Sequence, residues 1–234
     1  MWIFWDKKNW RECMKSLSAY ILVMLLGIPS AGTAAGKNFC GELYGTSFGP
    51  FDYLERFNLG KQLTVVEAHH FTSDVENLVK GESSSLGGDL HYTLRVWPNH
   101  HRALVSLARL SIRDKSTRFH GLKWPVECYF DRAIRFSATD AKVRTIYGGY
   151  LSHQGRNKEA VEQLEVAINL EPDNVTALYN LGLLYFKLKD YDKANDFANR
   201  AYALDFPLPG LKNKLIKAGK WRELSAYSKQ ESQD

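Results

Sequence analysis

The stretch YNLGLLYFKLKDYDKA, residues 179–194, decides the fold because it places a glycine inside an otherwise strong helical pattern. A glycine inside a helix costs about 1 kcal/mol relative to alanine, so its presence there indicates close approach by another helix. This glycine, Gly182, has a counterpart in Gly148, and other positions recur at the same displacement. Small residues pair with small ones and large apolar residues with large ones: Ala160 with Ala194, Ala167 with Ala201, Tyr147 with Leu181, and Leu151 with Tyr185. The chain therefore contains a 34-residue helical repeat.

The repeat resembles the tetratricopeptide repeat (TPR), a helix-turn-helix unit of this length, over residues 141–174 and again over residues 175–208. The second unit departs from the family pattern at Ala198 and in its late Pro207, and the first departs from it at Arg144. The resemblance implies an all-α fold, a right-handed α-solenoid in which small residues let paired helices approach closely. The residues that carry it are Tyr147, Gly148, Leu151, Gly155, Ala160, Leu164, Ala167 and Pro172, then Leu178, Leu181, Gly182, Tyr185, Ala194 and Ala201.

Residues 72–140 are interpreted as two further, degenerate TPR-like units. The separation of Pro98 from Pro172 equals two repeat periods plus an insertion of six. We place that insertion between the two helices of the later unit. In the earlier unit, Ser73 and Glu76 have the spacing of a capping box at the start of its first helix. A stack of this length satisfies the requirement for about three units in a stable solenoid.

Different segments are expected to flank the repeats. Residues 209–222 are predicted to form a capping helix, and residues 223–234 a frayed tail. Residues 36–71 show no repeat and are interpreted as an irregular N-terminal segment. The apolar face of the capping helix is predicted to consist of Leu211, Leu215 and Ala218.

Residues 1–35 are predicted to be a signal peptide. An apolar run, residues 17–28, follows four basic residues and precedes a segment of small residues that ends at Ala35, where cleavage is expected. The run is shorter than the roughly 20 residues of a membrane span, but its extension over residues 17–35 keeps an uncleaved inner-membrane anchor as an alternative. Translation can start at Met1 or at Met14. The sequence therefore predicts export, to the periplasm or the extracellular space.

The charge of the chain does not point to a nucleic-acid partner. Removal of residues 1–35 takes four of the 31 Lys and Arg and two of the 26 Asp and Glu, which leaves 27 against 24. This small excess is concentrated in the lysine-rich capping helix, where lysines on the outer face are simply solvated.

Cysteine usage fits an oxidising compartment, because the mature chain would keep two cysteines, Cys40 and Cys128. On a helix that starts at Pro125, Val126 and Phe130 face the core, and a rotation of about 100° per residue places Cys128 on the opposite face. A disulfide between the two cysteines is predicted to fasten the N-terminal segment across the outside of the solenoid. Two free thiols are the alternative.

No enzyme motif is present in the sequence: it has no phosphate-binding loop, no zinc-protease or serine-hydrolase signature and no haem-attachment motif. We therefore expect neither catalytic activity nor a cofactor. The alternative is a cysteine nucleophile at Cys40 with His69 or His70, which requires Cys128 to be reduced. Two histidine doublets precede or begin predicted first helices, whose starts line up along one edge of a solenoid. They are weak candidates for a zinc or copper site: His69, His70, His100 and His101, with Glu67 or Asp74 nearby.

The concave face is the expected binding surface, because the resemblance implies that the first helix of each pair lines an inner groove suited to an extended or helical peptide. Its aromatic and aliphatic members can instead be covered by the capping helix of the same chain. Carried over by repeat position, the groove residues are Lys142, Thr145, Gly149, Ser152, His153, Thr176, Tyr179, Asn180, Leu183, Phe186 and Lys187.

Three functions remain open at this point. The first is an exported TPR adaptor or scaffold of the cell envelope that binds a protein or peptide in its groove. The second is a structural subunit that assembles into a homo-oligomer or filament through the ends of the stack. The third is a metal-binding or hydrolytic protein that uses the histidine edge.

Overall fold

The computed structural model describes residues 39–45 and 47–223, and these residues form helices and connecting segments without a β-strand. The chain divides into two units, Met1–Asn38 and Phe39–Asp234. The predicted signal peptide and most of the predicted tail lie outside the described residues. Among the helices described, none is long and apolar enough to cross a membrane.

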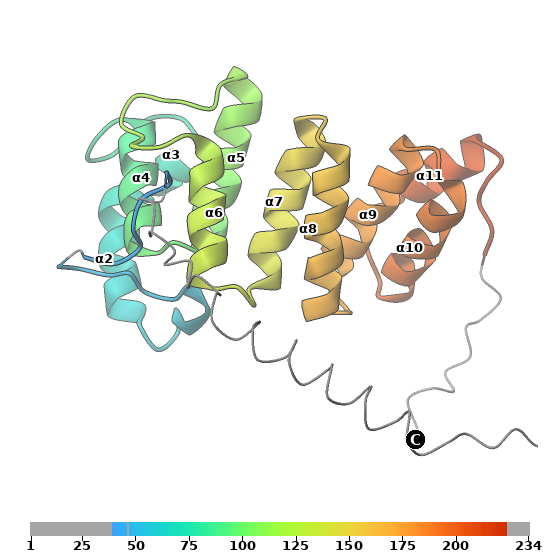
Figure 1. Cartoon of the computed structure of the whole chain (residues 1–234), viewed down its shortest axis with the longest axis horizontal. Coiled ribbons are helices and arrows are strands. Elements are labelled where there is room, and N and C mark those ends of the chain that lie inside the picture. The colour runs from blue at the N-terminus through green and yellow to red at the C-terminus, as the bar shows by residue number, and fades with distance from the viewer. Residues whose placement is uncertain (1–38, 46, 224–234) are drawn as a thin grey trace, which may run out of the picture. The chain divides into compact units, whose positions relative to one another are not determined.

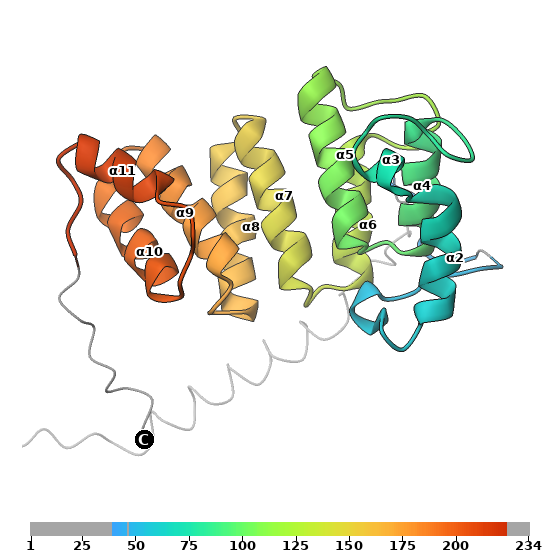
Figure 2. The same cartoon turned by 180° about the vertical axis from the view of Figure 1, so that it is seen from behind.

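The helices of the second unit follow one another side by side in chain order, as the colour sequence in Figure 1 and the reverse view in Figure 2 show. A short 3-10 helix, η1, precedes them at Tyr53–Glu55. The α-helices are α2 (Gly60–His70), α3 (Ser73–Glu76), α4 (Leu86–Val96), α5 (His101–Asp114), α6 (Val126–Phe136), α7 (Ala141–His153), α8 (Asn157–Leu170), α9 (Val175–Lys187), α10 (Tyr191–Ala203) and α11 (Gly210–Lys217).

The C-terminal half is built from two helix pairs, α7 with α8 and α9 with α10, as the repeat predicts. A Cβ atom added to Gly148 would lie 2.6 Å from Leu164 Cγ of the partner helix. A Cβ atom added to Gly182 would lie 2.4 Å from Leu211 Cδ2 of α11 and 3.4 Å from the Ala194 carbonyl oxygen. Both glycines are thus close-approach positions. The alanines of the repeat, Ala160, Ala167, Ala194 and Ala201, are each 0% exposed. The all-α solenoid predicted from the size pattern is confirmed.

The helices α5 and α6 form the preceding pair, and the insertion lies between them. It folds back over α4: the Ser85 hydroxyl at the start of α4 donates a hydrogen bond to the His120 carbonyl oxygen at 2.9 Å. Phe119 and Leu122 of the insertion pack against the N-terminal core cluster. The extra residues therefore cover the outside of the neighbouring pair without interrupting the stack.

The earliest unit differs from the prediction. The helix expected from Ser73 is a single turn, because Leu78 adopts a φ of 60° and reverses the chain after Asn77. Thr72 is its N-cap residue, and no side chain caps it, so the predicted Ser73–Glu76 capping box is wrong. The helix that packs on α4 is instead α2, which lies within the segment predicted to be irregular.

The helix α2 escaped prediction because it buries little. Val66 is its one buried residue, so the apolar periodicity that marks a helix is almost absent. Polar contacts hold it instead: the Thr93 hydroxyl contacts the His70 carbonyl oxygen at 3.2 Å. At the other end of the stack, Leu211 and Leu215 of α11 are fully buried as predicted, whereas Ala218 is exposed because α11 ends at Lys217.

Candidate partner-binding groove

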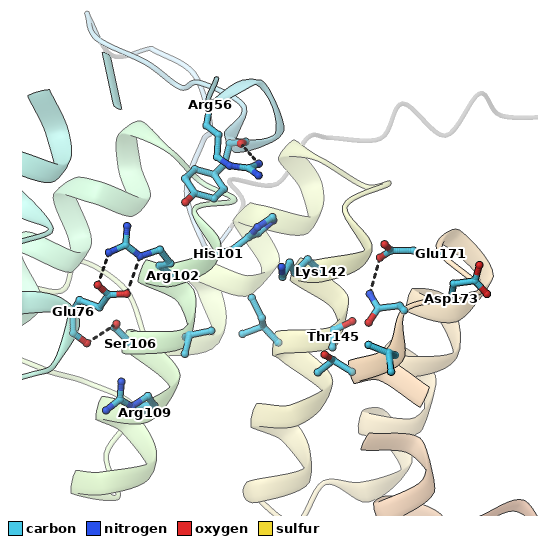
Figure 3. Close-up of a pocket in the computed structure, with 16 residues that line it drawn as sticks. Arg56, Glu76, His101, Arg102, Ser106, Arg109, Lys142, Thr145, Glu171 and Asp173 are labelled. Atoms are coloured by element: carbon cyan, nitrogen blue, oxygen red, sulfur yellow. Dashed lines mark hydrogen bonds and ion pairs between the residues drawn. The ribbon is translucent and has the colours of Figure 1, made fainter. Parts of the chain in front are cut away.

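An open hollow of about 620 Å³ lies where α5, α7 and α9 begin. Its volume falls within the range of about 300–1,000 Å³ that is typical of ligand clefts. Figure 3 shows the arginines of α5 on one side of it and Glu171 and Asp173, from the turn between α8 and α9, on the other. We refer to this hollow as the groove. Its lining residues are Tyr53, Arg56, Glu76, His101, Arg102, Val105, Ser106, Arg109, Lys142, Thr145, Ile146, Glu171, Asp173, Asn174, Val175 and Thr176.

The helix α5 supplies one complete face of the groove. Arg102, Val105, Ser106 and Arg109 recur at the i, i+3, i+4, i+7 spacing that places residues on one side of a helix. Val105 is 39% exposed, although it is apolar. Together with the partly buried Ile146 of α7, it forms an apolar patch between charged groups.

Some of the charges in the groove are already paired. The Arg102 guanidinium donates to the Glu76 carboxylate, with Nε 2.8 Å from Oε1, and it also reaches Glu67 at 3.2 Å. The hydrogen bond from Arg102 is the main cause that lowers the pKa of Glu76. The Ser106 hydroxyl donates to the Glu76 carbonyl oxygen at 2.9 Å, which fixes α3 against α5.

Other charges in the groove lack a hydrogen-bond or ion-pair partner among the described residues, although the charge of Arg109 helps to lower the pKa of Glu76. Among the described residues, no hydrogen bond or ion pair engages the side chains of Arg109, Lys142 or Asp173, and all three residues are exposed. Glu171 accepts one hydrogen bond, from the Asn174 amide at 2.7 Å. The groove therefore presents free cations on α5 and α7 and anions at the entrance to α9.

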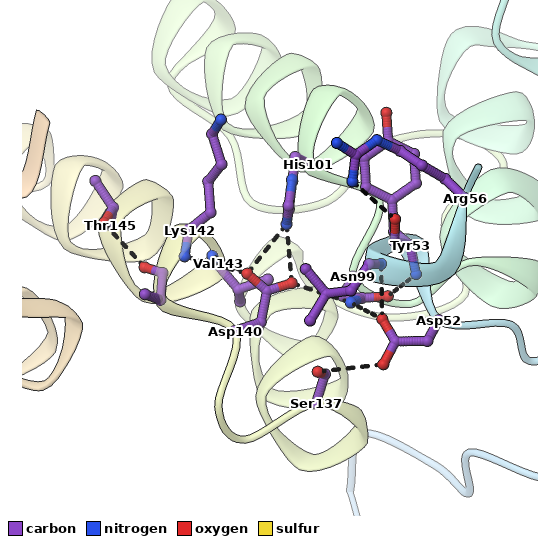
Figure 4. A network of polar contacts seen from close by, with 12 residues as sticks. Asp52, Tyr53, Arg56, Asn99, His101, Ser137, Asp140, Lys142, Val143 and Thr145 are labelled. Atoms are coloured by element: carbon purple, nitrogen blue, oxygen red, sulfur yellow. Dashed lines mark hydrogen bonds and ion pairs between the residues drawn. The ribbon is translucent and has the colours of Figure 1, made fainter. Parts of the chain in front are cut away.

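A buried polar network fixes the edge of the groove (Figure 4). The Asn99 amide donates to Asp52 at 2.7 Å and to Asp140 at 3.0 Å, and its oxygen accepts from the Tyr53 backbone N–H at 2.9 Å. Asp140 also contacts His101 Nε2 at 2.8 Å and caps α7 by accepting from backbone N–H groups. The network ties η1 to the first turns of α5 and α7, so it holds three walls of the groove in one geometry.

The charge state of Asp140 follows from its surroundings. Burial, the largest effect, acts to raise the pKa of this carboxyl group, but the hydrogen bond and charge of His101 together with the Asn99 amide lower it overall. The network is thus built around a carboxylate, which accepts every hydrogen bond offered to it.

The predicted groove residues are only partly brought together. Lys142, Thr145 and Thr176 line the groove. Tyr179 does not, because the capping helix covers it: its hydroxyl oxygen accepts from the Leu211 N–H at 3.2 Å, and its ring stacks on Phe206 at 4.1 Å. Tyr179 is 8% exposed and is not accessible to a partner.

The remaining predicted residues lie away from the groove. Lys187 donates to the Ser152 carbonyl oxygen at 3.3 Å and to Asn157 at 3.1 Å, so its charge is engaged near the far ends of α7 and α9. His153 lines a second, smaller hollow of about 330 Å³. Three further residues lie outside the groove lining: Asn180, and the partly buried Leu183 and Phe186, which pack on the C-terminal core.

The sequence-based prediction missed the whole α5 wall, because it was restricted to the two well-matched repeats. A signal was present. A displacement by one repeat period plus the insertion takes Arg102 to Lys142 and Val105 to Thr145. The contributions of Tyr53, Arg56 and Glu76 carry no such signal, since they come from segments outside the repeat pattern.

The structure contains the predicted disulfide, with Cys40 Sγ 2.08 Å from Cys128 Sγ. The Arg132 guanidinium donates to the Glu42 carbonyl oxygen at 2.7 Å and to the Cys40 carbonyl oxygen at 3.2 Å. Arg135 reaches the Gly41 carbonyl oxygen at 3.1 Å. Cys128 lies on the face of α6 away from the core as predicted, but it is 3% exposed because this N-terminal segment covers it.

The four candidate metal ligands do not converge. His70 Nδ1 contacts Asp89 at 2.9 Å, whereas His100 Nε2 contacts Glu67 at 3.0 Å. His101 contacts a third carboxylate, Asp140, and His69 is exposed. Within the part of the chain that the structure describes, no group of three or more His, Cys, Asp or Glu side chains could hold a metal ion. The four histidines, weak candidates from the sequence, therefore do not form a shared metal site in the described part of the chain.

The stacked helix pairs and the groove on their first helices define an α-solenoid of the kind that binds other proteins. A family model described as TPR repeat matches residues 152–189, and one described as tetratricopeptide repeat matches residues 175–206. The chain is therefore a protein with tetratricopeptide repeats over residues 152–206. Such repeats generally mediate protein–protein interaction, and the fold is typically a non-catalytic scaffold.

Known proteins share parts of this chain. The human and mouse proteins named Protein O-mannosyl-transferase TMTC1 are each 40% identical over 58 residues, 25% of this chain. That stretch is 7% of the human relative and 6% of the mouse relative, so the chain spans a small part of both. A solved structure described as the functional characterization of Pseudomonas aeruginosa pilF has 21% identity and a TM-score of 0.47, and the similarity covers 70% of each chain.

Proposed function

We propose that this protein is an exported TPR scaffold that holds a protein partner of the cell envelope in the groove. The observation that carries the proposal is the set of exposed side chains on successive first helices. Arg109 on α5 and Lys142 on α7 present charges without partners among the described residues, next to the exposed apolar Val105. Exposed apolar groups rimmed by polar ones are typical of protein-binding surfaces.

The rigidity of the edge supports the same function. Binding is stronger when the surface does not have to be ordered at the moment of association. The network of Asn99, Asp52 and Asp140 fixes the groove walls before any partner arrives. A preformed groove is what a scaffold requires.

The disulfide supports export. Disulfides persist in oxidising compartments and are rare in the reducing cytosol. The Cys40–Cys128 bond closes 88 residues of sequence and fastens a segment that begins shortly after the predicted cleavage position at Ala35. A chain folded in this form fits the periplasm or the extracellular space.

Site-specific photo-crosslinking tests the groove. A photoreactive amino acid is placed at Val105 or at Thr176, both exposed in the groove, and at Glu162, an exposed position of α8 outside it. After illumination in the cell that makes the protein, one and the same partner is expected from both groove positions and not from the α8 position. Products that are equal at all three positions, or absent at both groove positions, would overturn the groove as the binding surface.

Mass spectrometry tests export and processing separately. The chain recovered from the cell envelope is expected to lack residues 1–35 and to carry an oxidised Cys40–Cys128 pair. Recovery from the cytosol with Cys40 and Cys128 as free thiols, alkylated without prior reduction, would contradict export. Recovery from the membrane with the full leader would show the uncleaved anchor instead.

A further inference from the structure

The charges in the groove are distributed unevenly: unpaired cations lie on α5 and α7, and anions lie at the start of α9. On the α5 and α7 side, Arg109 and Lys142 are exposed and have no ion-pair partner among the described residues. On the α9 side, the Asp173 carboxylate has no hydrogen-bond or ion-pair partner among the described residues, and Glu171 accepts a hydrogen bond at one carboxylate oxygen only. Figure 3 shows Lys142 between the arginines of α5 and this acidic pair. A ligand that spans the groove therefore meets cations first and anions last.

The two kinds of charge do not neutralise each other within the protein. Arg102, by contrast, is paired within the protein, because its guanidinium contacts both Glu67 and Glu76. No described contact of 4.0 Å or less joins Lys142 to Glu171 or Asp173, although all of them line the same hollow. The free charges are thus available to a ligand, and charge complementarity of this kind selects partners and fixes their register.

The lining of the groove adds an apolar requirement. Val105, Ile146 and Val175 contribute apolar side chains to the lining from three different helices, α5, α7 and α9. Val105 is 39% exposed, so an apolar side chain placed on it would be removed from water. The lining therefore offers cations on α5 and α7, anions at the start of α9, and apolar groups on all three helices.

We propose, on the basis of the proposed function, that the partner enters the groove as an extended peptide segment of matching polarity. An acidic side chain faces Arg109 and Lys142, an apolar side chain lies over Val105, and a basic side chain faces Glu171 and Asp173. The segment crosses the first helices of three successive units, so the α5 unit is part of the site.

Synthetic peptides of one composition test this directly. A bipolar peptide carries a Glu-Glu block, a Leu-Ile-Leu block and a Lys-Lys block, and a control peptide has the same residues with the charges intermixed at both ends. Fluorescence anisotropy on the full mature chain is expected to give about tenfold tighter binding of the bipolar peptide at low salt, with the difference falling as salt is added. Bipolar peptides in both chain directions are used, because either can present the required order.

Charge reversal supplies the decisive variants. Arg109→Glu with Lys142→Glu is expected to lose the preference for the bipolar peptide. Glu171→Lys with Asp173→Lys added to this pair is expected to restore it, since the cationic and the anionic residues of the proposal are then both reversed. Lys158→Glu with Lys214→Glu changes the net charge by the same amount as the first pair at exposed positions outside the groove, and it is expected to bind like the wild type. Circular dichroism confirms that each variant is folded.

The outcomes separate the two proposals. Equal binding of bipolar and intermixed peptides, or no restoration in the variant with all four charges reversed, would overturn the polarity while leaving a peptide-binding groove. Absence of any peptide binding while photo-crosslinking at Val105 and Thr176 still captures one partner would show that the partner is not an extended bipolar segment. Failure of both measurements would overturn the proposed function itself.

Discussion

Replacement of Gly148 by alanine tests whether the repeat glycines are required for helix packing. A Cβ atom at this position would lie 2.6 Å from Leu164 Cγ, 3.0 Å from Leu164 Cδ2 and 3.2 Å from the Ala160 carbonyl oxygen. Leu164 is 1% exposed and the carbonyl oxygen belongs to the α8 backbone, so neither can move without shifting α8. Overpacking of this kind costs about 1–3 kcal/mol, while alanine returns about 1 kcal/mol of helix propensity. The net expectation is destabilisation of up to about 2 kcal/mol.

The neighbouring glycine provides a matched control. A Cβ atom at Gly149 meets nothing within 4 Å, and this residue lies in the same helix. Gly149→Ala is therefore expected to stabilise the protein by up to about 1 kcal/mol. Helix propensity cancels between the two variants, which leaves a difference of about 1–3 kcal/mol that is due to packing. Urea unfolding followed by circular dichroism measures it, and equal midpoints with equal m-values would refute the close approach of α7 and α8.

Three further perturbations probe the ends of the stack and its pH response. Replacing Cys40 and Cys128 by serine is expected to lower the free energy of unfolding by up to about 4–5 kcal/mol, from the closure of 88 residues of sequence; urea unfolding of both forms measures it, and unchanged stability would contradict a structural disulfide. Burial, assisted by neighbouring cations, lowers the pKa of His91 to about 4 from an unfolded value of 6.5. The folded state then binds fewer protons than the unfolded state, so the stability contributed by neutral His91 is present above about pH 6.5 and is lost as the pH falls toward 4. The expected loss is about 1–2 kcal/mol after allowance for partial exposure. His91→Phe should remove this part of the pH dependence of the unfolding free energy, and an unchanged dependence would contradict the assignment. Gly182→Ala places a methyl group against Leu211. The loss of unfolding free energy in the double variant Gly182→Ala, Leu211→Ala is therefore expected to be about 0.5–3 kcal/mol smaller than the sum of the losses in the two single variants. A double-variant loss equal to that sum would exclude the contact.

The architecture could be predicted because close packing leaves a size pattern in the sequence. Gly148 and Gly182 must be small for the helices to approach, and Leu164 must be large to fill the space beside Gly148. The helix α2 left no comparable pattern, because Val66 alone is buried within it. A helix can therefore be predicted from local sequence when it buries enough apolar residues to produce a hydrophobic periodicity, and α2 does not.

The N-terminal wall of the groove could not be predicted for a different reason. Tyr53 reaches its place through a hydrogen bond from its backbone N–H to Asn99, 46 residues later in the sequence. Asp52 and Asp140 are joined through the same amide. Neither spacing nor composition signals such contacts, because the pairing depends on the folded positions of η1, α5 and α7. Tyr179 is a different case: its repeat position marks it as a groove residue, but α11 covers it, which is the alternative that the sequence had left open.

The repeat determines which positions line the groove, but it does not determine which residue type occupies them. Arg102, Lys142 and Thr176 occupy one equivalent position in three successive units, once the insertion is allowed for, and all three line the groove. The fold needs nothing specific of Lys142 and Thr176, since substitutions at exposed positions usually change stability by no more than about 0.5 kcal/mol, whereas Arg102 pairs with Glu76 and Glu67. The glycine and alanine positions have the opposite constraint, because they are buried against a neighbouring helix. Variants at exposed, unpaired groove positions such as Lys142 and Thr176 should therefore change binding at nearly constant stability, whereas variants at the small-residue positions should unfold the stack before they alter what it binds.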